Sequence, residues 1–157
     1  MPPLAVGVKA PDFELDGSAG KVRLSKLLKE GHHVALAFFP LAFSPVCTNE
    51  MNLFEEVKDE LARLGARVVG VSVDSKYVQH AFAQSNGLTF PVLADFHPKG
   101  AVASQYGVMR EDGMAERALF IVDHTGVVRY SYVSEIGKNP GADRLLNVLE
   151  KMQAEGA

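Results

Sequence analysis

Cys47 is the residue of this 157-residue chain whose type and position most suggest covalent chemistry. It is the single cysteine, and it follows an apolar segment, His33–Phe39, that ends at Pro40. Pro45 lies two residues before it, and proline is favoured in the first turn of a helix, where its missing N–H has no helical partner. We therefore expect Cys47 in the first turn of a helix that follows a buried strand. Ligands bind at such a point in an open α/β sheet, and the unpaired N–H groups there stabilise an anion.

A reactive cysteine needs more than a helix terminus. A free thiol has a pKa of about 8.5 and is only a few per cent ionised at neutral pH. Lowering a thiol pKa to about 6 takes roughly 3.4 kcal/mol, whereas a helix terminus contributes typically about 0.3–1 kcal/mol. A hydrogen bond from a cation adds about 1.5–3 kcal/mol. The site should therefore include an arginine or lysine from elsewhere in the chain. The alternative is a structural cysteine, because free cysteine is among the most buried residue types.

The strands that must position Cys47 follow from the hydrophobic pattern. His33–Phe39 is predicted to be a central strand buried on both faces. Further strands are predicted at Val22–Leu24, Arg67–Val73 and Phe90–Leu93, with a hairpin of Arg117–Val122 and Val127–Val133 around a turn that contains Asp123.

Helices are predicted from apolar residues that recur every three or four positions. The segments are Pro45–Gly65, which carries Cys47, Ser25–Leu28 with Ser25 as its cap, a helix capped by Asp74 or Ser75 that ends at Asn86, Pro98–Tyr106, and a final helix around Leu145–Met152. Strands that alternate with helices form parallel βαβ units. We therefore predict an α/β fold in which residues 1–157 form a single domain, with helices on both faces of a mixed central sheet.

Composition excludes several classes of function. Apolar residues make up 47% and charged residues 22% of the chain, and the net charge of −3 leaves no basic excess for nucleic acid. The sequence shows no apolar run of about 20 residues and no signal peptide, so we expect no membrane span. A single cysteine cannot form an intramolecular disulfide, which favours a cytoplasmic location. The five histidines lack metal-ligand spacing and no nucleotide-binding motif is present, so we expect no metal and no cofactor.

The segment Pro40–Cys47 reads PLAFSPVC and matches P-x-x-x-[T/S]-x-x-C, the active-site motif of peroxiredoxins. The similarity extends over about residues 5 to 150, through the strings APDF, GVSVD, FPVLAD and RALFIVD. The strings FFPLAF and HPKGAVASQYGV most resemble the AhpE-type, one-cysteine branch of the family. This resemblance implies a thioredoxin-like fold and a thiol peroxidase.

The resemblance also implies a role for each motif residue. Cys47 would be the peroxidatic cysteine, whose thiolate attacks a peroxide oxygen and becomes sulfenic acid. Ser44 would hydrogen-bond the peroxide, and Arg117 would be the cation that favours the thiolate and holds the reacting oxygens. Supporting roles fall to Pro40, which would exclude water, to the N–H groups of Val46 and Cys47, which would stabilise developing charge, and to Glu50, which would orient Arg117.

Two positions depart from the commonest family pattern. The hydroxyl residue is usually threonine but here is Ser44, which lacks the methyl group that restricts the rotamer, so we expect a looser pocket. Glu50 and Asn52 stand where a nearby second cysteine would be, and none follows to residue 157. The sulfenic acid therefore needs an external thiol as its reductant: a low-molecular-weight thiol, a glutaredoxin- or mycoredoxin-like protein, or thioredoxin.

The loop around Cys47 bears on substrate and assembly. Hydrogen peroxide, organic hydroperoxides and peroxynitrite share the reacting O–O bond, and the apolar Leu41, Ala42 and Phe43 favour organic peroxides. In the family, the loop around Phe43 lies near a dimer interface, so we predict a homodimer. Arg129 is expected to be a solvated or interface residue.

Two other functions are weighed against the peroxidase. In a redox-sensing or holdase module, oxidation of Cys47 would signal to a partner. Thioredoxin-like disulfide exchange is disfavoured because Glu50 replaces the second cysteine.

Overall fold

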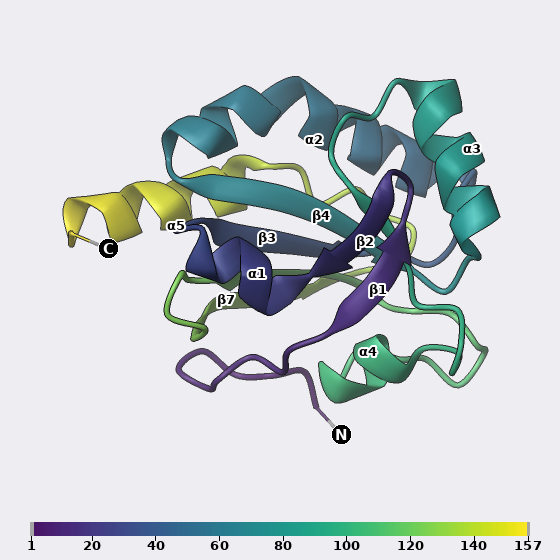
Figure 1. Cartoon of the computed structure of the whole chain (residues 1–157), viewed down its shortest axis with the longest axis horizontal. Helices are drawn as coiled ribbons and strands as arrows, with labels where there is room; N and C mark the ends of the chain where they lie inside the picture. Colours follow the sequence, from purple (N-terminus) through teal and green to yellow (C-terminus); the bar gives the residue numbers. More distant parts are fainter. Residues whose placement is uncertain (1, 157) are drawn as a thin grey trace.

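Seven strands form one mixed sheet in the computed structural model, which describes residues 2–156 (Figure 1). The strands are β1 (Glu14–Gly17), β2 (Gly20–Arg23), β3 (His33–Phe38), β4 (Ala66–Ser72), β5 (Val92–Ala94), β6 (Arg117–Val122) and β7 (Val128–Ser134). Their order across the sheet is β2-β1-β5-β4-β3-β6-β7. β3, β4 and β5 are parallel, whereas β6 runs antiparallel to β3 and pairs with β7 as a hairpin. The predicted mixed sheet with a hairpin at one side is confirmed.

Helices cover both faces of this sheet, as predicted. They are α1 (Leu24–Lys29), α2 (Pro45–Arg63), α3 (Lys76–Asn86), α4 (Ala101–Gln105) and α5 (Asp143–Ala154). Buried residues of α2, α3 and α5 belong to one apolar cluster, and those of α1 and α4 belong to a second cluster on the other face (Figure 1). Among residues 2–156, no helix combines the length and hydrophobicity needed to cross a bilayer.

The alternation of side chains along the two central strands decides which residues face α2. In β3, Ala35 and Ala37 belong to the cluster under α2, whereas Val34 and Leu36 face the other way. All six residues of β3 are buried, which confirms the prediction of a strand covered on both faces. In β6, Leu119 and Ile121 face α2, so the two-residue period places Arg117 on that same face.

The N-terminal hairpin was not predicted. A short strand was predicted at Val22–Leu24, but β1 forms as well and pairs with both β2 and β5. In β1, Leu15 is the one hydrophobic residue, and it packs against the core, so β1 has too little hydrophobic signal of its own. Its formation depends on the edge of the sheet that β5 offers. Gly17 fits there because a Cβ at this residue would lie 2.8 Å from a Leu93 side-chain carbon.

Several predicted boundaries and one predicted cap were wrong. Strand β5 lies two residues later than the predicted segment at its start, and α4 is shorter than the predicted helix over 98–106. Ser25 does not cap α1, because the helix already begins at Leu24. The carboxylate of Asp12 instead accepts hydrogen bonds from the N–H groups of Phe13 and Ser25, each at 2.9 Å. A side chain distant in sequence has taken the place of the local cap.

Candidate active site

Cys47 lies in the first turn of α2, directly after the loop that follows β3. Ser44 is the N-terminal flanking residue of the helix, with extended backbone angles, and Pro45 is the first helical residue, as predicted. Cys47 is fully buried, and its side chain belongs to the apolar cluster that also contains Met51 and Phe54. The cysteine is therefore a core residue that lies beyond the carboxyl end of a central strand, in the first helical turn where it was predicted.

The start of α2 presents backbone donors around Cys47. The first N–H with a partner four residues back is that of Thr48, which donates to the carbonyl of Ser44 at 2.9 Å. The N–H groups of Val46 and Cys47 precede this bond, so they have no intrahelical acceptor. The Thr48 hydroxyl also donates to the Ser44 carbonyl, at 2.8 Å. The N–H groups of Val46 and Cys47 at the start of the helix are therefore available to stabilise negative charge on the Cys47 side chain.

Ser44 is held by the loop that precedes the helix. Its hydroxyl donates a hydrogen bond to the carbonyl of Leu41 at 3.0 Å and makes no capping bond to α2. Because a hydroxyl has one proton, the Ser44 oxygen keeps its lone pairs for an external donor. The loop bond orients this acceptor even though serine lacks the methyl group of threonine.

Arg117 reaches α2 through a buried ion pair. Its Nη1 lies 2.9 Å from Oε1 of Glu50, and the two side chains are 3% and 0% exposed. Glu50 is three residues after Cys47, so both lie on the same face of α2. The Nε of Arg117 donates to the carbonyl of Ile136 at 2.9 Å, which fixes the guanidinium from its second edge. The fold therefore brings to the base of the cysteine turn the one cation that the family resemblance selects.

Among residues 2–156, the Glu50–Arg117 pair leaves two polar atoms without a hydrogen bond, Oε2 of Glu50 and Nη2 of Arg117. Burial raises the pKa of Glu50 to about 7, and the hydrogen bond and charge of Arg117 oppose that rise. Oε2 of Glu50 is buried without a hydrogen-bond partner among residues 2–156. Arg117 donates hydrogen bonds from Nε and Nη1, whereas its Nη2 makes no hydrogen bond to any of residues 2–156. A guanidinium with a free, nearly buried edge can bind an oxygen atom that carries partial negative charge.

Of the remaining predicted residues, Pro40 and Val46 are fully or partly shielded from solvent, whereas Phe43 is exposed. Pro40 is buried immediately after β3, and Val46 is half-buried beside Cys47. Phe43 is 52% exposed and adopts a positive φ of 70°, so it is not the core residue that its type alone suggests. Its ring contacts Phe82 of α3 edge-on, with 5.2 Å between centroids.

Of the two residues predicted to cap α3, Asp74 does not do so and Ser75 does. Ser75 caps α3, because its hydroxyl accepts the hydrogen bond of the Val78 N–H. The Asp74 carboxylate instead accepts from the N–H of Ala42 in the cysteine loop at 2.8 Å. The sequence alone had indicated for Asp74 only a local role as a cap of the helix that follows it. The Ile136 carbonyl was not predicted, because a backbone acceptor has no side-chain signal.

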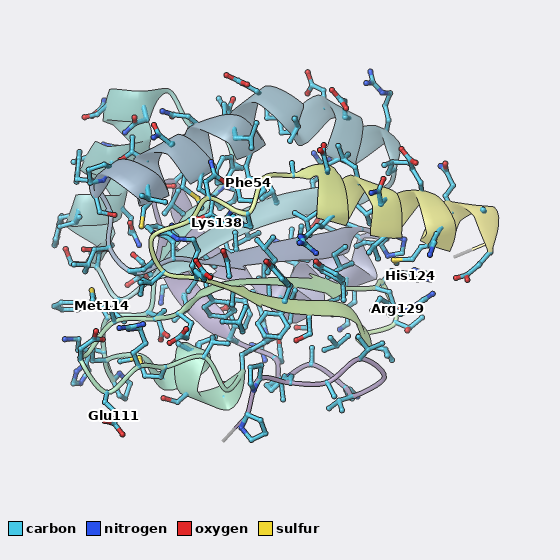
Figure 2. The ribbon with its side chains drawn as sticks, turned by 180° about the vertical axis from the view of Figure 1, so that it is seen from behind. Phe54, Glu111, Met114, His124, Arg129 and Lys138 are labelled. Carbon is cyan, nitrogen blue, oxygen red and sulfur yellow. The ribbon has the colours of Figure 1, made fainter. Side chains whose placement is uncertain are left out.

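Arg129 and Asp123 lie elsewhere, as expected. Asp123 Oδ1 accepts from the N–H groups of Thr125 and Val127, which confirms its role in the hairpin turn. Arg129 pairs with Asp123 and with the exposed Glu155 of α5. Figure 2 shows Arg129 and His124 together beside α5, away from the loop that carries Lys138.

Comparison with known proteins agrees with this geometry. Over 95% of the chain, the fold matches the crystal structure of peroxidoxin BcpB from Mycobacterium tuberculosis, with a TM-score of 0.86, 33% identity and 98% of that chain covered. A reduced 2-Cys peroxiredoxin from Plasmodium vivax matches with a TM-score of 0.89 and 25% identity, over 98% of this chain and 84% of the other. The fold is thus the thioredoxin-like fold of peroxiredoxins, and the predicted fold class is confirmed.

Sequence comparison identifies the family. Residues 6–131 match the model of the AhpC/TSA family. Alkyl hydroperoxide reductase E of Mycobacterium tuberculosis is 34% identical over 136 residues, which cover 86% of this chain and 89% of that protein. A chloroplastic 2-cysteine peroxiredoxin of Chattonella marina var. antiqua is 37% identical over 161 residues, or 96% and 81% of the two chains. The chain belongs to the AhpC/TSA family of peroxiredoxins and is a thiol-dependent peroxidase.

Proposed function

We propose that this peroxidase works by a one-cysteine mechanism, in which Cys47 becomes sulfenic acid and an external thiol reduces it. The observation that carries the proposal is the burial of Cys47 in the first turn of α2, three residues before Glu50, which pairs with Arg117. The relatives include both an alkyl hydroperoxide reductase E and 2-cysteine peroxiredoxins. The single cysteine among 157 residues favours the AhpE-type, one-cysteine branch.

The first half-reaction is a displacement at oxygen. The Cys47 thiolate attacks one oxygen of the hydroperoxide, so that an S–O bond forms while the O–O bond breaks. The leaving oxygen takes a proton and departs as water or an alcohol. The sulfur is oxidised by two electrons to sulfenic acid, and the peroxide is reduced. Because the nucleophilicity of a thiolate falls with its pKa, the rate must come mainly from groups that polarise the O–O bond.

The protein supplies three such groups. The free Nη2 of Arg117 would bind the oxygens as charge develops on them. The N–H groups of Val46 and Cys47 would stabilise the same charge from the helix terminus. The Ser44 hydroxyl, whose proton is held by Leu41, would accept the hydrogen bond of the peroxide O–H. Pro40 would exclude water, and Glu50 would orient the guanidinium.

Regeneration takes two equivalents of an external thiol. The first thiol attacks the sulfenic sulfur, releases water and forms a mixed disulfide with Cys47. The second thiol breaks that disulfide and leaves Cys47 reduced. A low-molecular-weight thiol, a glutaredoxin- or mycoredoxin-like protein, or thioredoxin fits this chemistry. The substrate range would include hydrogen peroxide, organic hydroperoxides and peroxynitrite, with the apolar loop Leu41–Phe43 favouring organic peroxides.

The same loop supports a proposed homodimer. Leu41 and Phe43 are 38% and 52% exposed, although both are large and apolar. Contact with a second copy would cover them. Sedimentation at micromolar concentration should show a dimer, and a Phe43→Ser variant should shift it toward monomer. A monomer in the unmodified protein would contradict this proposal. A reducing, cytoplasmic location is proposed on the single cysteine, which cannot form an intramolecular disulfide.

The decisive experiment follows oxidation of the parent, Cys47→Ser and Ser44→Ala proteins by stopped flow and intact mass after one equivalent of peroxide. The parent should gain one oxygen far faster than a free thiol reacts, and Cys47→Ser should gain none. Ser44→Ala should lose about tenfold to a hundredfold in peroxide rate, while its alkylation by iodoacetamide stays within about twofold. Oxidation of the parent at the rate of an ordinary cysteine would reject the proposal in favour of a redox-sensing or holdase module.

A further inference from the structure

A chain of hydrogen bonds runs from α3 to the cysteine loop. Gln79 of α3 donates from Nε2 to the carbonyl of Leu93 at 2.8 Å and to the hydroxyl of Ser72 at 2.7 Å. The Ser72 hydroxyl lies 2.6 Å from Oδ2 of Asp74, and this same Oδ2 accepts from the N–H of Ala42 at 2.8 Å. The chain therefore joins three parts of the fold: α3, the carboxyl ends of β4 and β5, and the loop before α2.

The direction of every bond in this chain is determined by its two ends. A carbonyl can only accept, so the group of Gln79 next to Leu93 must be the amide nitrogen. That nitrogen also donates to Ser72, which leaves the single proton of the Ser72 hydroxyl for Asp74. A backbone N–H can only donate, so Asp74 must accept from Ala42 as well. Oδ2 of Asp74 is thus an acceptor from both sides. Gln79 and Ser72 are buried, which protects the chain from exchange with water.

The loop that this chain reaches is a strained one. Phe43, next to Ala42, has a φ of 70°, a left-handed conformation that costs an aromatic residue free energy and persists where the surroundings hold it. Two contacts hold it, one from α3 and one from the segment that follows β4: the ring of Phe43 on Phe82, and the Asp74 bond to Ala42. Ser44 and the start of α2 follow directly.

We infer that Asp74 is a positioning residue of the peroxidase, which holds the cysteine loop through Ala42 and is itself oriented by Ser72 and Gln79. This inference rests on the proposed function, because it assigns Asp74 to the reaction of Cys47 with peroxide. Asp74 acts at a distance: it keeps Ser44 and the N–H groups of Val46 and Cys47 in the geometry that the polarised O–O bond requires. Small displacements of such groups cost large factors in rate.

The test uses a pair of variants that differ in one property. Asp74→Ala removes the acceptor, whereas Asp74→Asn removes the charge but retains an oxygen that can accept from Ala42 and Ser72. Asp74→Ala should oxidise with hydrogen peroxide about tenfold to a hundredfold more slowly than the parent, while its alkylation by iodoacetamide does not fall. Asp74→Asn should recover to within about threefold of the parent. Asp59→Ala, at an exposed position of α2, is the matched control and should react like the parent.

A second readout is independent of peroxide chemistry. Amide hydrogen exchange at Ala42 should be about tenfold faster in Asp74→Ala, with no change at the amides of β6. Ser72→Ala, which leaves Asp74 in place, should give a smaller increase and serves if Asp74→Ala does not fold.

The outcomes separate the two proposals. A parent-like peroxide rate in Asp74→Ala, equal losses in Asp74→Ala and Asp74→Asn, or unchanged exchange at Ala42 would each overturn the positioning role. If the parent itself reacts like an ordinary thiol, the proposed function fails, and the exchange measurement still decides whether Asp74 holds the loop.

Discussion

The hairpin β6–β7 carries two arginines that pair with carboxylates in contrasting surroundings. Arg117, at the start of β6, pairs with Glu50 in the interior, where both side chains are almost fully buried. Arg129, in β7, pairs with Asp123 and Glu155, and its side chain is 30% exposed. Figure 2 shows Arg129 near the C-terminal helix, at a distance from the loop of Lys138, which follows Ile136, the partner of Arg117. The same type of ion pair is therefore shielded from water at Arg117 and partly open to water at Arg129.

The difference lies in desolvation. Moving two charges out of water costs several kcal/mol per ion, so a buried pair is weak evidence for stability. An exposed pair costs little and contributes about 0–1 kcal/mol. The Glu50–Arg117 pair is retained inside the protein although it leaves Oε2 of Glu50 unpartnered. This cost is consistent with the proposed role of the interior pair at Cys47, whereas Arg129 and its partners link the hairpin turn to α5.

The largest effect is expected from breaking the interior pair. Arg117→Met leaves Glu50 buried without its cation, which should lower the free energy of unfolding by about 3–5 kcal/mol. It should also slow oxidation by peroxide about a hundredfold or more, since Nη2 is lost from the site. Urea unfolding and stopped-flow oxidation measure the two quantities. The double variant Glu50→Leu with Arg117→Met should be more stable than Arg117→Met and equally slow; equal stability would show that burial of Glu50 is not the cause.

A smaller effect is expected from the titration of Glu50. Its pKa of about 7 lies above the ordinary value of 4.5, so the folded state binds more protons than the unfolded state between these pH values. Stability should therefore fall as pH rises from about 4.5 to 7, by about 3 kcal/mol from this group. Glu50→Gln should remove this part of the slope in urea unfolding measured across that range.

At the exterior pair, Asp123 should matter more than its arginine. Burial raises the pKa of Asp123, but hydrogen bonds from Thr125, Val127 and Arg129 lower it by more than burial raises it. The net shift of this pKa is therefore downward. Stabilisation from this carboxylate is present above its unfolded pKa and is lost as pH falls through the folded value, below about pH 4. Asp123→Ala should cost about 1–2 kcal/mol at pH 7 with an unchanged peroxide rate. A loss of peroxide rate in a folded variant would contradict the separation of the two regions.

The smallest effect is expected from Arg129→Ala. The Arg129 side chain is 30% exposed and that of Glu155 is 65% exposed, so the variant should lose less than about 1 kcal/mol of stability, and the loss should shrink in high salt. Thermal unfolding at low and high salt is the measurement. A loss comparable to that of Arg117→Met would remove the basis of the comparison.

The sequence by itself determined the central elements and the chemistry of the site. The apolar run of β3, Pro45 at the start of α2 and the spacing of apolar residues along that helix are local signals, and they placed Cys47 in its first turn. Arg117 was selected by the family resemblance and not by spacing. Glu50 and Arg117 are 67 positions apart, so no local sequence pattern could indicate their contact.

Tertiary structure decided the features that depend on partners distant in the chain. Strand β1 forms because β5 offers it an edge, and Asp12, rather than Ser25, satisfies the start of α1. Asp74 holds Ala42 instead of capping the helix beside it. In each case the partner is distant in the chain, and the packing of the sheet brings it within reach. Burial likewise raises the pKa of Glu50, which no neighbour in sequence could reveal.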